Sequence, residues 1–257
     1  MSTSPSANVQ QNPWGLRFKE KVELLAHWTH AHPFRAILYA LGIALMLEYL
    51  SLPNARLQDL EKENPRQTAL MVQRQREASE SGKPFHLQEM WVPLSHISPH
   101  LVHAVIVSED GTFYEHGGVD WYEVEESIEK NLEEGKAARG GSTISQQLAK
   151  NLFLSTSKDP LRKLKELIIT LRMERMLSKR RILEIYLNVI EWGNGVFGAE
   201  AAAKKYFGKS AASLTRDEAA QMAAVIPSPL RHQPNKSSAY VDRRAMIILE
   251  RMNARGY

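Results

Sequence analysis

The 257-residue chain contains no cysteine. Disulfide bonds and thiolate catalysis are therefore excluded, while either side of a membrane remains open to the chain. A strong excess of either sign of charge is also missing, since 33 Lys and Arg against 29 Asp and Glu give a formal net charge of only +4. This small basic excess favours anionic partners such as nucleic acid, phospholipid or a diphosphate-bearing substrate. The length and the hydrophobic content of 43% suit one folded domain plus appendages.

Internal repeats are missing, and little of the chain shows the alternation of apolar and polar residues that is typical of strands. Apolar residues recur instead at helical spacing through much of the second half. Ser98 followed by Pro99 marks a helix start, and Thr215 forms a capping box with Glu218. The sequence therefore predicts a mainly α-helical domain, with helices over 99–107, 161–177, 182–190, 199–206 and 219–226.

Long hydrophobic runs are limited to one. It begins at Ala36, covers about 17 residues and contains Glu48 as its single charge, which is the short limit for a membrane span. No small-residue cleavage site follows convincingly, so the run predicts an uncleaved signal anchor rather than a buried core helix. The positive-inside rule places the N-terminus in the cytoplasm and the rest of the chain on the outer side of the membrane, because basic residues precede the run at Arg17, Lys19, Lys21 and Arg35.

This pattern divides the chain into four parts. Residues 1–32 are a cytoplasmic tail, in which 14–29 form an amphipathic helix that is either interfacial or a plain spacer. Residues 33–52 are the transmembrane signal anchor. Residues 53–90 are a charged, helix-prone juxtamembrane linker or jaw whose apolar residues are too scattered for a full core, and which could dock on the domain behind it. Residues 91–257 form the folded domain.

The segment RGGSTISQQLAKN over 139–151 is the most informative stretch of the domain. Two glycines permit a turn, after which Thr143 and Gln146 fit a capping box. On the helix that follows, Lys150 lies four residues after Gln146, and Asn151 lies four residues after Gln147, so amides and an ammonium share one face. Such a row of donors suits a polyhydroxylated, anionic ligand such as a sugar phosphate. An ordinary capped surface helix would show the same pattern.

Two acidic residues, Glu109 and Asp110, follow the helix predicted over 99–107. Carboxylates at a helix C-terminus face the negative end of its dipole, at a cost of about 0.3–1 kcal/mol each when exposed. With partial burial the same field raises a carboxyl pKa toward the range of a general base or acid. The pair is thus a candidate for catalysis, and a solvated helix end is the alternative.

A third acid, Glu166, lies among cations on the polar face of the helix predicted over 161–177. Arg162 and Lys163 precede it by four and three residues, a spacing that a surface ion-pair face would also show. Together with Lys150 and Lys158, these cations could converge on one strongly anionic group, as a diphosphate leaving group requires.

Five motifs then occur in order: SEDGTFYEHGGVDW (108–121), GGSTISQQLAKN (140–151), RKLKE (162–166), RILEIYLN (181–188) and GVFGAEAAAKKYFGK (195–209). Together they resemble the motif series of the peptidoglycan glycosyltransferases, the family-51 transglycosylase domain, from about residue 52 onward. With no penicillin-binding domain after Tyr257, the chain resembles the monofunctional biosynthetic form. The resemblance implies a lysozyme-like, mainly helical fold behind a single N-terminal membrane anchor.

The resemblance also implies roles for individual residues. Glu109 matches the base that deprotonates the acceptor's sugar 4-hydroxyl, which attacks the anomeric carbon of the growing chain, inverts it to a β-1,4 link and releases undecaprenyl diphosphate. Lys150 matches the lysine that stabilises the departing diphosphate. Glu166 matches a second essential glutamate that either orients the acceptor phosphate or holds a divalent ion. Polar contacts to the donor correspond to Ser142, Gln146, Gln147 and Asn151. The first motif adds Asp110, Phe113 and His116, as substrate contacts or as framework.

One departure from the family pattern concerns the diphosphate site. Lys158 stands where the family usually has arginine, and lysine keeps the charge but loses the bidentate fork. Either Lys158 suffices, or Arg162 carries more of the load, with Lys163 beside it. The expected cofactor is a divalent cation, Mg²⁺ or Mn²⁺, near Glu166, with no organic cofactor. The expected partners are lipid II, the growing glycan strand, the bilayer and proteins of cell division or elongation.

Competing interpretations follow from the same residues. A lytic transglycosylase or muramidase would share the fold but needs a protonated acid at the glycosidic oxygen, and it leaves the cationic cluster unexplained. An inactive membrane-anchored glycan-binding scaffold fits poorly with Glu109, Lys150 and Glu166 all present. Nucleic-acid binding is not expected, because no nucleic-acid motif occurs. The histidines at 27, 30, 32, 96 and 100 do not form a metal-ligand pattern.

Overall fold

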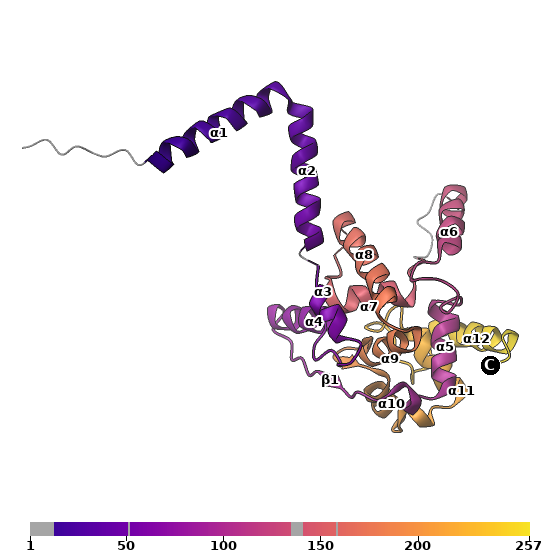
Figure 1. Ribbon diagram of the computed structural model, residues 1–257. Helices are drawn as coiled ribbons and strands as arrows, with labels where there is room; N and C mark the ends of the chain where they lie inside the picture. The colour runs from indigo at the N-terminus through magenta and orange to yellow at the C-terminus, as the bar shows by residue number, and fades with distance from the viewer. Residues whose placement is uncertain (1–12, 51, 135–140, 158) are drawn as a thin grey trace, which may run out of the picture. The chain divides into compact units, whose positions relative to one another are not determined.

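The computed structural model describes residues 13–50, 52–134, 141–157 and 159–257, which fall into two compact units divided between Leu52 and Pro53 (Figure 1). The polar segment 1–12, Gly140 of the second motif and Lys158 lie outside the described residues. The expected mainly helical chain with one apolar N-terminal helix is confirmed.

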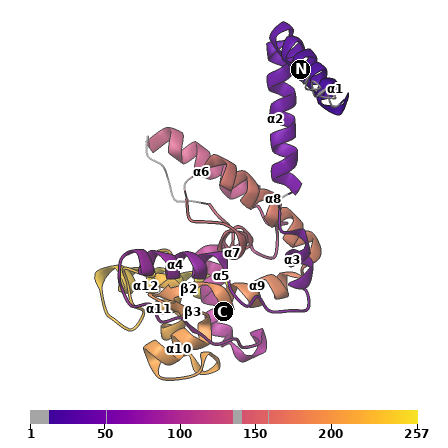
Figure 2. The ribbon, with the colours of Figure 1, turned by 90° about the vertical axis from the view of Figure 1, so that its left-hand side faces the viewer.

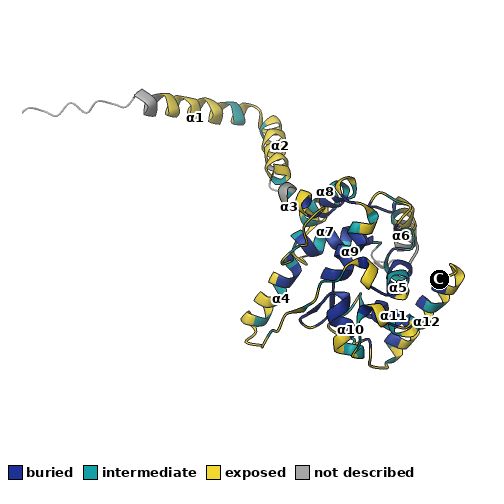
Figure 3. Ribbon diagram, turned by 60° about the horizontal axis from the view of Figure 1, so that its bottom comes forward, coloured by how far each residue is buried: buried dark blue, intermediate teal, exposed yellow. Residues whose placement is uncertain are grey.

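The first unit consists of α1 (Pro13–Ala31) and α2 (Pro33–Leu50). Pro33 starts α2 in the position where its missing N–H costs nothing. The Trp28 ring packs at the corner between the two helices, 5.8 Å from the Tyr39 ring. Among the described residues, α2 is the one helix long and apolar enough to cross a membrane, and none of its 18 residues is buried (Figure 3).

The second unit is built almost entirely from helices around a small sheet. Its elements are α3 (Asn54–Asp59), α4 (Ala69–Glu80), β1 (Gln88–Glu89), the 3₁₀ turn η1 (Leu94–His96), α5 (Pro99–Glu109), α6 (Trp121–Glu134), α7 (Ile144–Phe153), α8 (Pro160–Met176), α9 (Lys179–Val189), β2 (Glu191–Gly193), β3 (Val196–Phe197), α10 (Ala199–Phe207), the 3₁₀ turn η2 (Ala211–Ser213), α11 (Arg216–Val225) and α12 (Ala239–Ala254). In the sheet, β3 pairs parallel with β1 and antiparallel with β2.

Helix α7 lies at the centre of the core and packs on α4, α8 and α9. Ile144 and Leu148 on its inner face are fully buried, and such side chains each contribute about 1.5–3 kcal/mol by leaving water. On another side, α5 packs against α11 and α12, which lie side by side in both views (Figures 1 and 2). The packing of neighbouring helices therefore fixes the positions of the C-terminal end of α5 and of the polar face of α7.

The segment predicted as a linker contributes directly to this core. Leu57 and Met71 are buried, and Met71 packs with Phe197 of β3 and the Phe85 ring. The Arg181 guanidinium of α9 donates to the carbonyl oxygens of Leu60 and Glu63, both at 2.8 Å. The segment therefore docks on the rest of the domain, through burial between distant segments that spacing along the chain does not reveal.

Candidate functional site

The two acids at the end of α5 have different surroundings. Asp110 ends the helix and turns its carboxylate to the next motif, where Oδ2 accepts from the Ile144 backbone N–H at 2.9 Å. Oδ1 pairs with His116 Nε2 at 2.8 Å, and His116 Nδ1 accepts from the Gly118 N–H. Asp110 thus caps the positive N-terminus of α7, where a carboxylate is favourable. Both of its carboxylate oxygens are thus engaged by donors of the chain itself.

Glu109 is the second of the two acids and the last residue of α5. Its carboxylate accepts hydrogen bonds from Gln147 Nε2 and from the Ser108 hydroxyl, both at 3.0 Å. The guanidinium of Arg244 on α12 lies 4.0 Å away. Burial raises the pKa of Glu109 above the ordinary value of 4.5, and the three neighbours only partly oppose this effect. A buried carboxylate with a raised pKa has the properties of a general base.

The capping box predicted at the start of α7 is confirmed. Thr143 Oγ1 accepts from the Gln146 N–H at 3.2 Å, and Gln146 Oε1 accepts from the Thr143 N–H at 3.1 Å. Oε1 of Gln146 is therefore committed to the cap. Gln147 reaches Glu109, and Asn151 is buried. The predicted polar row is thus only partly free for a ligand, because its amides also fasten the helix and the acid.

Three of the four cations expected to converge, Lys150, Arg162 and Lys163, lie near one another beside this helix, and Lys158 is outside the described residues. Glu166 on α8 is buried and accepts from Arg162 Nη1 at 2.6 Å and from Lys163 Nζ. Lys163 also donates to Ser142 Oγ at 3.2 Å. Burial lowers the pKa of Lys150 on α7, and the charges of Arg162 and Lys163 lower it further, while Glu166 and Glu109 oppose them. Lys150 therefore lies within electrostatic reach of both acids and both cations.

The surroundings of Glu166 do not fit a divalent cation. Both of its carboxylate oxygens accept from cationic side chains, Arg162 and Lys163, rather than lying beside other anionic ligands. The part of the chain that the structure describes also contains no group of three His, Asp or Glu arranged to hold a metal. We derive no step of the reaction through a metal here.

The other residues of the first motif form the framework of the site. Phe113 is fully buried, with the Lys179 ammonium 4.5 Å from its ring centroid. His116 is held by Asp110, as above. Sequence reasoning missed two neighbours of the acid, Tyr186 and Arg244. Tyr186 lies inside the motif RILEIYLN, and its place among the apolar residues of that motif was the only sign in the sequence that it belongs near the site. Arg244 follows all the recognised motifs and had none.

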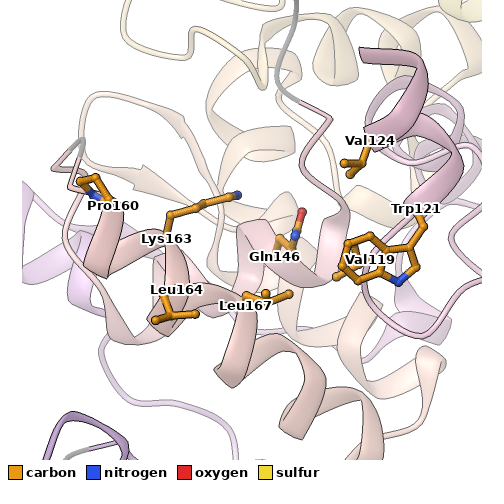
Figure 4. A pocket seen from close by; sticks show the side chains of 8 residues that line it. All are labelled: Val119, Trp121, Val124, Gln146, Pro160, Lys163, Leu164 and Leu167. Atoms are coloured by element: carbon orange, nitrogen blue, oxygen red, sulfur yellow. The ribbon is translucent and has the colours of Figure 1, made fainter. Parts of the chain in front are cut away.

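An apolar pocket of about 410 Å³ opens next to the cations, between the residues before and in α6 and those at the start of α8 (Figure 4). It is lined by Val119, Trp121, Val124, Gln146, Pro160, Lys163, Leu164 and Leu167. In Figure 4 the Lys163 chain extends from α8 toward Gln146. Because Lys163 also reaches Glu166 and Ser142, one residue joins the apolar pocket to the cationic cluster. The combination suits a ligand with an apolar chain and an anionic head.

Comparison with known proteins gives a consistent result. Residues 76–253 match the family model described as transglycosylase. A protein of Nitrosospira multiformis is 51% identical over 189 residues, which cover 74% of this chain and 82% of the relative. Proteins of Dechloromonas aromatica (49% over 191 residues) and Chromobacterium violaceum (49% over 189 residues) each cover 74% of this chain and 83% of the relative. Each of the three is named a biosynthetic peptidoglycan transglycosylase.

Proposed function

The chain belongs to the transglycosylase family and is a peptidoglycan glycosyltransferase, and on that premise we propose that it polymerises lipid II with Glu109 as the general base. The observation that carries this proposal is the pairing of two features. A carboxylate whose side chain is only 9% exposed and whose pKa is raised ends α5, and a cluster of cations lies on the neighbouring α7 and α8. The first feature suits removal of a proton and the second suits departure of an anion.

Glu109 begins the reaction by taking the proton of the acceptor's sugar 4-hydroxyl. The oxygen then forms a bond to the anomeric carbon of the growing chain, while the bond from that carbon to the diphosphate oxygen breaks and its electron pair leaves with the diphosphate. Attack from the opposite face inverts the carbon to a β-1,4 link. Ser108 and Gln147, which donate to the Glu109 carboxylate, hold it in its ionised form before the proton arrives.

The leaving group is stabilised by Lys150, Arg162 and Lys163. Charge grows on the diphosphate as its bond to the sugar breaks, and cations fixed in a partly buried site interact with it strongly. Glu166 keeps Arg162 and Lys163 together against their mutual repulsion through its two ion pairs. In this account Glu166 acts on the substrate through the cations it holds. These ion pairs do not fit the Mg²⁺ or Mn²⁺ expected near Glu166, and a contribution of Lys158 stays a prediction.

The lipid part of the substrate is assigned to the pocket beside Lys163. Its walls are apolar apart from Gln146 and Lys163, so a polyprenyl chain would fit there with its diphosphate at the cations. We assign α2 as the anchor in the bacterial inner membrane, with the N-terminus in the cytoplasm, because basic residues precede it. Contacts with cell-division or elongation proteins stay a prediction.

The rival reaction is cleavage of glycan strands. A raised carboxyl pKa would serve a lytic enzyme as well, since such an enzyme needs a protonated acid. The cationic cluster distinguishes the two reactions, because strand cleavage releases no diphosphate.

The test incubates the detergent-solubilised full chain with labelled lipid II and resolves the products before and after muramidase digestion. We expect a polymer that muramidase degrades. Shortening of preformed strands without polymer would show the lytic reaction instead, and retained lipid II binding without either product would show an inactive scaffold.

A further inference from the structure

The side-chain amide of Gln147 bridges two buried groups from different helices. Its Nε2 donates to Glu109 Oε2 at 3.0 Å and, more weakly, to the Ser142 carbonyl oxygen at 3.4 Å, and its Oε1 accepts from the Tyr186 hydroxyl at 2.9 Å. Three helices therefore meet in one chain of hydrogen bonds, from Tyr186 on α9 through Gln147 on α7 to Glu109 on α5. The proposed reaction uses Glu109 and Gln147, while the tyrosine has no part in it.

The two ends of an amide differ chemically although they have nearly the same shape. Nε2 can only donate a hydrogen bond, and Oε1 can only accept one. Tyr186 is fully buried, and burial raises the pKa of its hydroxyl well above the ordinary value of 10.0, so the phenol keeps its proton. A protonated phenol aimed at Gln147 stabilises the orientation in which Oε1 faces the tyrosine and Nε2 faces the acid.

Resting on the proposed role of Glu109 as base, we propose that Tyr186 is a positioning residue that fixes the orientation of the Gln147 amide, so that Glu109 always meets a hydrogen-bond donor. A turned amide would present Oε1 to Glu109 and would accept a hydrogen bond from the protonated acid. Tyr186 prevents that orientation. The ionised form of Glu109 is thereby favoured before each turnover, and the proton is released more readily afterwards.

Other groups around Glu109 do not depend on Tyr186. Ser108 donates to it from α5, and Asp110 next to it repels its charge. Lys150 of α7 and Arg244 of α12 bring positive charge near Glu109, and Arg244 Nε also donates to the Ala224 carbonyl of α11. Arg251 of α12 donates to the Val107 carbonyl, two residues before Glu109. Removing the Tyr186 hydroxyl leaves all of these in place, so a change in the titration of Glu109 reports on the amide.

The test is the pH dependence of kcat/KM for lipid II polymerisation by the full chain carrying Tyr186→Phe. The acid limb of this profile reports the pKa of the base in the free enzyme. Loss of the donor should move the acid limb to higher pH by about one unit. At pH values below the pKa of the base, kcat/KM should therefore fall about tenfold, while at pH values well above that pKa it should change little. Tyr206→Phe is the matched control, because that hydroxyl donates to the Trp192 carbonyl at 3.3 Å and should leave the limb unchanged.

A second background shows whether the effect passes through the amide. Gln147→Met removes both hydrogen bonds at similar length, and adding Tyr186→Phe to it should move the limb no further. An unshifted limb with a uniform fall in activity would show that Tyr186 only fills the core, and a further shift in the Gln147→Met background would show a direct effect; either result overturns the proposal.

Two further variants keep the test decisive. If Tyr186→Phe does not fold, 4-fluorophenylalanine at position 186 replaces it, because this side chain lacks the donor but fills nearly the same space. The limb should again move to higher pH, and no movement would overturn the proposal. Glu109→Gln separates this inference from the proposed function. Full activity in Glu109→Gln refutes Glu109 as the base, whereas loss of activity there with an unshifted Tyr186→Phe profile refutes only the role of Tyr186.

Discussion

Replacing Asp110 by asparagine tests whether one carboxylate holds the first two motifs together. The side chain is 2% exposed and accepts two hydrogen bonds, from the Ile144 N–H and from His116 Nε2. His116 Nδ1 accepts from the Gly118 N–H, which places the ring proton on Nε2. Both partners of Asp110 are therefore donors. Asparagine has one acceptor end and one donor end, so it satisfies only one of them.

The expected magnitude follows from these contacts. A buried donor left without a partner costs about 1–3 kcal/mol. Loss of the negative charge at the N-terminus of α7 adds about 0.3–1 kcal/mol. Burial raises the pKa of Asp110, which means that burying the charge has a cost that asparagine avoids. We therefore expect Asp110→Asn to lower the free energy of unfolding by about 2 kcal/mol.

Urea denaturation of the detergent-solubilised chain, followed by near-ultraviolet circular dichroism, measures this loss. Asp59→Asn is the control, because Asp59 is exposed at the C-terminal end of α3 and should change stability by less than about 0.5 kcal/mol. Polymerisation should also fall, since α7 carries Gln147 and Lys150. A stability of Asp110→Asn equal to that of the control would refute the network described for His116 and Ile144.

Three further changes test other parts of the account. Lys150→Gln removes one cation from the leaving-group site and should lower kcat/KM by about a hundredfold without unfolding the chain; kinetics with lipid II measure this, and an unchanged rate would exclude Lys150 from the chemistry. Gly198→Ala should lower the free energy of unfolding by about 2 kcal/mol, because φ at this position is +84° and the added Cβ would lie 2.6 Å from the Asn188 carbonyl oxygen. Urea titration measures this loss, and a stability equal to that of the wild type would show that the backbone relaxes around the added methyl group. Leu164→Asp places a charge in the apolar pocket and should raise KM for lipid II but not for a short-chain analogue; equal effects on both would place the lipid elsewhere.

Local signals in the sequence were sufficient to predict several elements. The capping box of Thr143 and Gln146 and that of Thr215 and Glu218 both form, because each involves residues three apart on one helix turn. The ion pairs of Glu166 with Arg162 and Lys163 also follow from helical spacing. The N-terminal apolar helix was predicted from composition alone.

Contacts between distant segments could not be predicted in this way. Spacing suggested that Glu109 and Asp110 share one unfavourable position, whereas Asp110 is turned toward the N-terminus of α7, which restricts the catalytic interpretation to Glu109. Arg244 reaches the acid from α12, where no motif marked it. The burial of Leu57 and Met71 likewise depends on packing between the segment 53–90 and the rest of the domain. These features arise from tertiary structure, which neither periodicity nor capping signals record.

The central claim is that Glu109 removes the proton from the attacking hydroxyl. Single-turnover polymerisation of lipid II by Glu109→Gln tests it most directly, with lipid II binding and urea stability measured on the same preparation. Glu115→Gln is the control, because Glu115 is an exposed glutamate of the same motif. We predict that Glu109→Gln binds lipid II and folds as the wild type does, but turns over at least about a thousandfold more slowly. Turnover within about tenfold of the wild type would contradict the account.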